Sequence, residues 1–167
     1  SEWVPLWGFL ALVSLFQVIP DAFLASVLGT LVFPETGGPR IGKVPLAMAG
    51  MWTIPLWVSL FTARQLDQGS LYRGLWIAAL VCGVVLASSE ATLWAVPIWE
   101  AAEGVTTVGR VAVYVILPEV LLGAVTYLAY HLSRERSWAA KGAVAGLVAL
   151  VYLGALCASY GLVERVL

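Results

Sequence analysis

The chain has 167 residues, of which 61% are hydrophobic and 11% are charged, and its formal net charge is −1. Ordinary soluble domains carry about 25% charged residues, so this composition excludes that class and indicates an integral membrane protein. The slightly negative charge argues against a nucleic-acid partner, which would require a basic surface. We expect one domain over residues 1–167, an all-α bundle of about five transmembrane helices.

The first apolar run, residues 3–33, would be about 46 Å long as a helix, against a hydrocarbon core of about 30 Å. Pro20 lacks a backbone N–H and disfavours helical geometry at the residue before it, so the run should break there. Either a tilted helix kinks at Pro20, or the chain crosses once and residues 22–33 form a re-entrant or interfacial segment. Gln17 and Asp21 form a polar stripe that should point inward. Asp21 could instead lie at the interface and cap the following segment.

The second run, residues 44–63, follows a turn-rich loop. It carries Pro45 and Pro55, and two prolines in one spanning helix suggest a bend that lines a cavity. Packing by neighbouring helices could equally satisfy the carbonyl groups that the prolines leave free. Met48 and Trp52 lie one turn apart along one side of this helix.

The third run, residues 75–97, carries Glu90 well inside it. A carboxylate at the centre of a spanning helix costs about 2.5–3.5 kcal/mol to insert, so Glu90 should face the interior as a functional or pairing residue. Trp94 lies one turn beyond it on the same face. Alternatively, Glu90 lies near the interface and its side chain reaches water.

The fourth run, residues 108–130, holds Glu119 near its middle, which makes Glu119 the acid least suited to a surface position. Tyr127 approaches the far interface. The fifth run, residues 143–163, has a face of small residues that lets helices approach closely. A homo-oligomer is one partner arrangement that the sequence allows.

Five crossings place the two ends of the chain on opposite sides of the membrane. The connections at residues 64–74 and 132–142 carry five of the nine Lys and Arg residues, and the other side carries four. Because cytoplasmic loops are enriched in basic residues, we expect the N-terminus in the cytoplasm, in a bacterial or archaeal cell membrane.

The two halves of the sequence share an order of features that suggests an internal repeat. Asp21 is followed after 24 residues by Pro45, and Glu90 is followed after 28 residues by Pro118. Membrane proteins built from repeats often place a shared site at the repeat interface near the midplane. We therefore expect Asp21, Glu90 and Glu119 to converge on one water-poor cavity.

Several cofactor chemistries lack the residues that they need. The single histidine, His131, lies at a helix end and cannot by itself supply a zinc or di-iron site. Lys43 and Lys141 lie in loops, so no retinal Schiff base can form within the bundle. The sequence has no G-x-S-x-G, no H-E-x-x-H and no glycine-rich phosphate loop. We expect neither a metal nor a cofactor.

The sequence does provide acids in an apolar setting rich in Trp and Tyr. A buried carboxyl group can protonate an alkene or an epoxide, and aromatic faces stabilise the resulting carbocation. Glu119 is the expected general acid or its partner, and Glu90 and Asp21 should share the proton and the counter-charge. A lipophilic isoprenoid substrate would reach the site from the membrane lipid. The residues expected to contact it are Trp52, Trp94, Gln17, Met48 and Tyr127.

The stretch LVFPETGGPRIGKVPL after Asp21, followed in the second half by LPEV, resembles the integral membrane lycopene-cyclase domain and the related carotenoid-biosynthesis hydratases. In that family an acid precedes a G-x-x-x-G-x-[IV]-P-L stretch and a P-x-E-E motif. The resemblance implies acid-initiated cyclisation or hydration of an isoprenoid. The chain departs from the family after Pro45, where the acids of P-x-E-E are missing, and after Pro118, where one Glu replaces a pair.

The same acids are also compatible with a different class of function. They could form a proton or cation relay in a small transporter or accessory subunit, or they could simply pair with Arg110. Proton-coupled flux in liposomes would favour transport, whereas a polyene or lipid that co-purifies with the protein would favour the enzyme.

Overall fold

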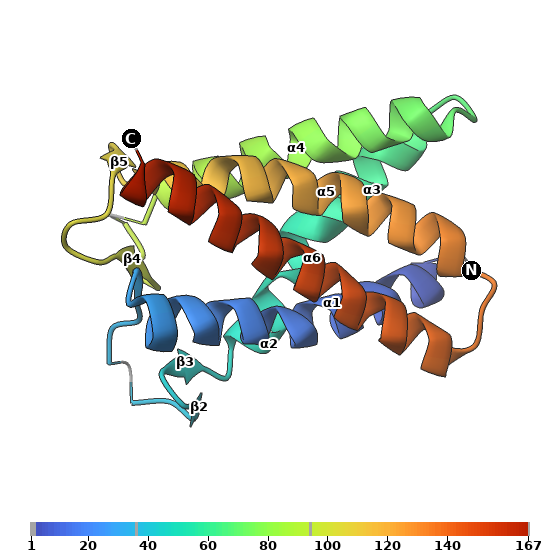
Figure 1. Ribbon diagram of the computed structural model, residues 1–167. Helices are drawn as coiled ribbons and strands as arrows, with labels where there is room; N and C mark the ends of the chain where they lie inside the picture. The colour runs from blue at the N-terminus through green and yellow to red at the C-terminus, as the bar shows by residue number, and fades with distance from the viewer. Residues whose placement is uncertain (1–2, 36, 94, 167) are drawn as a thin grey trace.

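The chain forms an all-α bundle, which the computed structural model describes over residues 3–35, 37–93 and 95–166 (Figure 1). Within these described ranges, four helices are long and apolar enough to cross a membrane. They are α1 with the π-helical turn η1 (Trp3–Leu28), α4 (Leu71–Ala91), α5 (Val113–Ser133) and α6 (Trp138–Arg165). The fold therefore agrees with the predicted membrane bundle.

The first apolar run does not break at Pro20. Helix α1 (Trp3–Phe23) continues through this proline and passes into η1 (Leu24–Leu28), which ends at Gly29 with φ +67°. A spanning helix tolerates proline when local π-helical geometry and neighbouring helices satisfy the freed backbone groups. Only after Gly29 does the chain become extended, in strand β1 (Leu31–Val32).

The second run also differs from the prediction, because it is not one spanning helix from residue 44 to residue 63. Strands β2 (Arg40–Ile41) and β3 (Val44–Pro45) form a hairpin, and a single turn, α2 (Met48–Met51), precedes helix α3 (Thr53–Leu66). The 14 residues of α3 span about 21 Å, less than the hydrocarbon core. The prolines explain the break, since one lies in a strand and the other in the first turn of α3, where its missing N–H costs nothing.

Helices α4 and α5 are connected by a loop with three short strands. Helix α4 starts at Leu71 after the cap Ser70, whose hydroxyl accepts a hydrogen bond from an amide at 3.3 Å, and it ends at Ala91 rather than at residue 97. Strand β4 (Glu100–Ala101) pairs antiparallel with β1. Strands β5 (Thr107–Val108) and β6 (Val111–Ala112) form a hairpin, so α5 begins at Val113 and not at residue 108.

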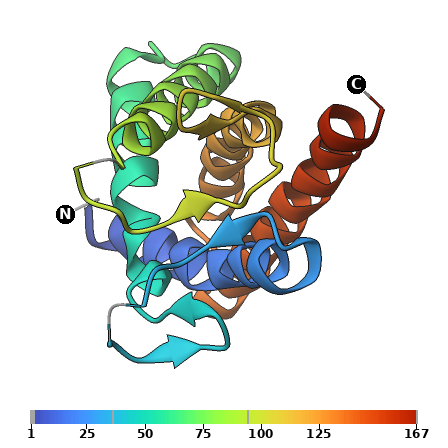
Figure 2. The same ribbon diagram turned by 90° about the vertical axis from the view of Figure 1, so that its left-hand side faces the viewer.

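The helices pack in a closed order around the bundle axis. Helix α1 contacts α6, α6 contacts α5, α5 contacts α4, α4 contacts α3, and α3 returns to α1. The chain ends lie at opposite ends of the bundle, and Figure 2 shows the strand-bearing loops lying across the end where α1 and α4 finish. Each half of the chain has a long helix, a loop with strands and a further helix, but the further helices, α3 and α5, have 14 and 21 residues. The internal repeat stays a prediction.

The closest helix contact places α4 against Gly123 of α5. A Cβ atom at Gly123 would overlap the carbonyl oxygen of Ala78 and the Cβ of Cys82, both on α4. The backbones of the two helices can approach this closely only because the side chain is missing. This contact sets the position of α5, and with it the position of Glu119 one turn earlier.

We therefore expect Gly123→Ala to lower the thermal unfolding temperature of the purified protein, since overpacking of this kind costs about 1–3 kcal/mol. The matched control is Gly154→Ala in α6, because nothing lies within 4 Å of a Cβ at Gly154. Circular dichroism melts in detergent would measure both variants. Equal melting of the two variants would contradict the close α4–α5 contact.

Candidate functional site

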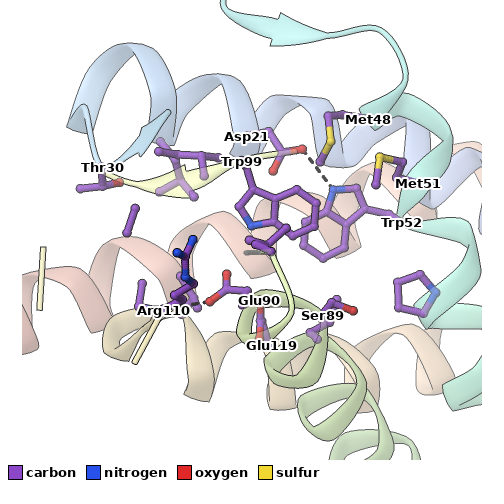
Figure 3. A pocket seen from close by; sticks show the side chains of 18 of the residues that line it. Asp21, Thr30, Met48, Met51, Trp52, Ser89, Glu90, Trp99, Arg110 and Glu119 are labelled. Atoms are coloured by element: carbon purple, nitrogen blue, oxygen red, sulfur yellow. Dashed lines mark hydrogen bonds between the residues drawn. The ribbon is translucent and has the colours of Figure 1, made fainter. Parts of the chain in front are cut away.

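A cavity of about 240 Å³ lies between the helices at the end covered by the loops. Its walls come from α1, the α2–α3 junction, α4, α5 and α6, and its lid comes from the paired strands β1 and β4, which contribute the register partners Leu31 and Ala101. Most of the wall is apolar. The polar and aromatic side chains that line it are Asp21, Thr30, Trp52, Ser89, Glu90, Trp99, Arg110, Tyr114, Glu119 and Tyr152 (Figure 3).

Asp21 reaches the cavity from α1 and is held by an indole. The Trp52 Nε1–H donates a hydrogen bond to Asp21 Oδ2 at 3.1 Å, and Asp21 is only 3% exposed. Trp52 can make this contact because it lies at the junction between α2 and α3, where the break directs its ring toward α1. Asp21 therefore has a fixed donor, which stabilises its carboxylate form.

Glu90 lies one residue before the end of α4. Its Oε2 accepts a hydrogen bond from the backbone N–H of Ala112 at 3.2 Å, which ties the β5–β6 hairpin to α4. The indole of Trp99, in the loop between these elements, lies beside the Glu90 carboxyl group (Figure 3). Glu90 thus positions the loop that closes the cavity as well as lining it.

Glu119 projects from α5, directly after Pro118. It is 4% exposed, and its Oε2 has no hydrogen-bond partner among the described residues. Glu90 is close enough to interact with it electrostatically. Three carboxyl groups in one water-poor cavity cannot all ionise, and an unpartnered one is the most costly to charge.

Aromatic side chains surround the acids. Tyr152 of α6 packs edge-on against Trp52, with ring centroids 5.8 Å apart. The Tyr114 hydroxyl donates to Thr30 Oγ1 at 2.9 Å, which joins α5 to the segment after η1. Among the described lining residues, Arg110 is the one basic side chain. No group of three or more His, Cys, Asp or Glu side chains within the described ranges is placed to hold a metal ion.

A family model described as a domain of unknown function (DUF6989) matches residues 18–163. The chain belongs to this family. All the residues that line the cavity lie within the matched range of the DUF6989 domain. Searches of curated proteins and of solved structures found no match to the chain.

Five of the residues singled out from the sequence of this DUF6989 domain meet at the cavity. They are Asp21, Met48, Trp52, Glu90 and Glu119. Their location agrees with the expected convergence, while their roles in catalysis and binding stay predictions. Trp94 lies outside the described residues.

Two of the residues expected to contact substrate are elsewhere. Gln17 is fully buried on α1 but does not line the cavity, because the residue that turns into the cavity is Asp21, one turn later. Tyr127 lies near the opposite end of α5, where its hydroxyl donates to Asp67 Oδ2 at 2.6 Å in the α3–α4 loop. Helical spacing gave the correct face for both residues but not the depth at which the cavity ends.

The sequence analysis assigned no part of the cavity to Trp99, Tyr114 or Tyr152. Trp99 was interpreted as an interfacial anchor, and it enters the wall because β4 pairs with β1, a contact between segments about 70 residues apart. Local periodicity carries no signal for such a pairing. Tyr152 could have been found, since it is the one tyrosine inside the fifth apolar run.

The Tyr127–Asp67 contact predicts a pH-dependent stability. Hydrogen bonds from the Tyr127 hydroxyl and the Gly69 amide lower the pKa of Asp67 below its ordinary value of 3.8. A carboxylate with a lower pKa in the folded state stabilises the fold above its unfolded pKa, and this contribution is lost as the pH falls through the folded pKa.

Tyr127→Phe is therefore expected to lower the unfolding temperature near neutral pH, and its difference from the wild type should disappear in acid below the pKa of Asp67. The control is Tyr72→Phe, since the Tyr72 side chain is exposed. Melting curves across pH would measure the effect. A difference that stays constant across pH would show that Tyr127 acts by packing alone.

Proposed function

We propose that this protein is an integral membrane enzyme of isoprenoid metabolism that starts cyclisation or hydration of a lipophilic polyene or terpene by protonating it. The observation that carries the proposal is the meeting of three carboxyl groups, from three different helices, with two indole rings around one largely apolar cavity. Each buried acid is costly in a membrane helix, so their meeting at one place supports a functional role.

The first step transfers a proton from a carboxyl group to a carbon–carbon double bond. The O–H bond breaks, the π electrons of the alkene form a C–H bond, and the neighbouring carbon becomes a carbocation. In cyclisation a second double bond supplies the electrons for the new C–C bond. In hydration a water oxygen supplies them. Loss of a proton to the carboxylate then restores the acid.

The hydrogen bonds of the three acids support a division of roles. Glu119 has an oxygen without a partner among the described residues, so its proton is available to a substrate. Asp21 accepts from Trp52 and Glu90 accepts from Ala112, which suits both to the carboxylate form that takes the proton back. Glu119 is therefore the proposed general acid, and Asp21 and Glu90 supply the counter-charge.

Aromatic faces would stabilise the carbocation. Trp52 and Trp99 both line the cavity, and a cation within about 6 Å of an indole face gains about 0.5–2 kcal/mol from cation–π attraction. Tyr152 holds Trp52 from behind, so the position of this ring is defined by packing.

The size and position of the cavity limit the substrate. Ligand pockets usually measure about 300–1,000 Å³, so 240 Å³ holds a short isoprenoid or one end of a longer polyene. Ile54 lines the cavity and is 64% exposed on the bundle surface, which supplies an apolar entrance from the membrane. The resemblance to the lycopene-cyclase domain and the carotenoid hydratases supports the same chemistry.

A second candidate is a proton or cation relay in a transporter or accessory subunit. The polar side chains of Ser14, Gln17 and Thr126 are fully buried without hydrogen-bond partners in the described part of the chain. They lie on α1 and α5, the helices that carry Asp21 and Glu119, and they would extend a polar path away from the cavity. Proton flux in liposomes that depends on Glu119 would favour this candidate over the enzyme.

The proposed chemistry predicts the effect of Glu119→Gln, which preserves shape and removes the transferable proton. Conversion of an isoprenoid substrate, measured by mass spectrometry of lipids extracted after incubation, should fall by at least a hundredfold, the lower range for loss of a general acid. The folded yield should survive. The control is Glu103→Gln, because Glu103 is exposed in the α4–α5 loop. Full activity of Glu119→Gln would refute the assignment.

We further propose that the N-terminus is cytoplasmic, in a bacterial or archaeal cell membrane. Five basic residues lie at the end of the bundle that carries the N-terminus and the α3–α4 and α5–α6 connections, and cytoplasmic loops are enriched in such residues. They are Arg64, Arg73, Arg134, Arg136 and Lys141.

This orientation predicts the labelling of single cysteines in a background without Cys82 and Cys157. In intact cells a membrane-impermeant maleimide should label Glu103→Cys in the α4–α5 loop and should not label Gln68→Cys in the α3–α4 loop until the cells are permeabilised. The reverse pattern would show that the protein is inserted the other way. Labelling of both positions would contradict the bundle as a membrane-spanning unit.

A further inference from the structure

Arg110 lies at the rim of the cavity on a well-defined turn. The turn joins strands β5 and β6, whose register pairs Val108 with Val111, and it contains Gly109 with φ +64°. The side chain of Arg110 lines the cavity and is also exposed at the surface. Figure 3 shows its guanidinium group on the same side of the cavity as Glu90.

The guanidinium group of Arg110 is not used by the rest of the described chain. No hydrogen bond, ion pair or ring contact among the described residues engages it, even though Glu90 lines the same cavity. Glu90 instead accepts from the Ala112 amide, two residues after Arg110. This hydrogen bond anchors the hairpin, so the backbone that carries Arg110 is held in place while its charge stays available.

The cavity therefore has two ends of opposite character. At one end the exposed Ile54 continues the apolar wall onto the surface that faces lipid, and at the other end Arg110 offers a cation beside the loops. An amphiphile matches both ends, with its chain along the apolar wall and its head group at the rim. A guanidinium group binds phosphate and carboxylate groups through two parallel hydrogen bonds.

We propose that Arg110 binds the anionic head group of an isoprenoid substrate, such as a prenyl phosphate, while the prenyl chain occupies the cavity beside the acids. This inference rests on the proposed function. The head group is held and not cleaved, because protonation takes place at a double bond of the chain. Arg110 thus selects substrates that carry a terminal anion and fixes which double bond reaches Glu119.

The test compares two ligands that differ only in the anion, geraniol and geranyl phosphate. Binding of radiolabelled ligand is measured on protein in phosphatidylcholine nanodiscs, and empty nanodiscs correct for partition into lipid. We expect wild-type protein to bind geranyl phosphate at least tenfold more tightly than geraniol. Arg110→Gln should remove this preference and leave the affinity for geraniol unchanged, which also shows that the variant is folded. Arg110→Lys should retain part of the preference.

The matched control is Arg165→Gln, because Arg165 is exposed at the same end of the bundle and does not line the cavity. This variant should behave as the wild type. Equal affinity of the wild type for both ligands, or a preference that survives Arg110→Gln, would overturn the role of Arg110 and leave the isoprenoid cavity standing. If neither ligand binds above empty nanodiscs, the proposed function fails together with the inference.

Two further arms separate the sources of the anion. Inorganic phosphate at millimolar concentration should not compete with geranyl phosphate, since the prenyl chain supplies part of the affinity. Replacing phosphatidylcholine by phosphatidylglycerol should also leave binding unchanged. Competition by inorganic phosphate would show a site for a free anion, and loss of binding in phosphatidylglycerol would show that Arg110 holds a lipid head group. Either result would overturn the substrate assignment.

Discussion

Removing a carboxyl group from water is the constraint on which the site depends. Inside a bundle such a group must find a donor, share a proton or stay neutral, because a lone charge is costly in an apolar surrounding. The three acids meet this constraint in different ways. Asp21 has the Trp52 indole and Glu90 has the Ala112 amide, whereas one oxygen of Glu119 has no partner among the described residues. The inequality of their environments gives the cavity its chemical direction.

The irregular parts of the fold serve the same constraint. A continuous helix over residues 44–63 would not produce the break at Trp52 that turns its indole toward α1, and a longer α4 would carry the chain past the point where Glu90 meets the β5–β6 hairpin. Deviations from ideal helices are thus concentrated at the cavity end. At the other end the connections are short turns capped by serine or asparagine-like side-chain contacts, such as Ser70 and Asp67.

Physical reasons separate what the sequence could predict from what it could not. The long helices follow from apolar runs that exceed the bilayer thickness, and the meeting of the acids follows from the cost of leaving each one alone. The ends of α4 and α5 were misplaced because residues 92–112 are apolar enough to resemble helix while their backbone pairs with distant strands. The contact of Leu31 with Ala101 is of this kind. Tyr127 was misassigned because its partner, Asp67, lies in a loop that no helical pattern connects to it.

The shortness of α3 has a consequence for the surrounding bilayer. Four neighbouring stretches of 21–28 residues match or exceed the hydrocarbon thickness, but α3 covers only about two thirds of it. Lipids beside α3 must thin, tilt or expose head groups to that side of the protein, at a cost of a fraction of a kcal/mol per ångström. Ile54 lies at the start of this helix, so the apolar entrance opens where the membrane is deformed. A molecule that leaves the lipid there crosses disordered acyl chains, which lowers the barrier to exchange on that flank of the bundle.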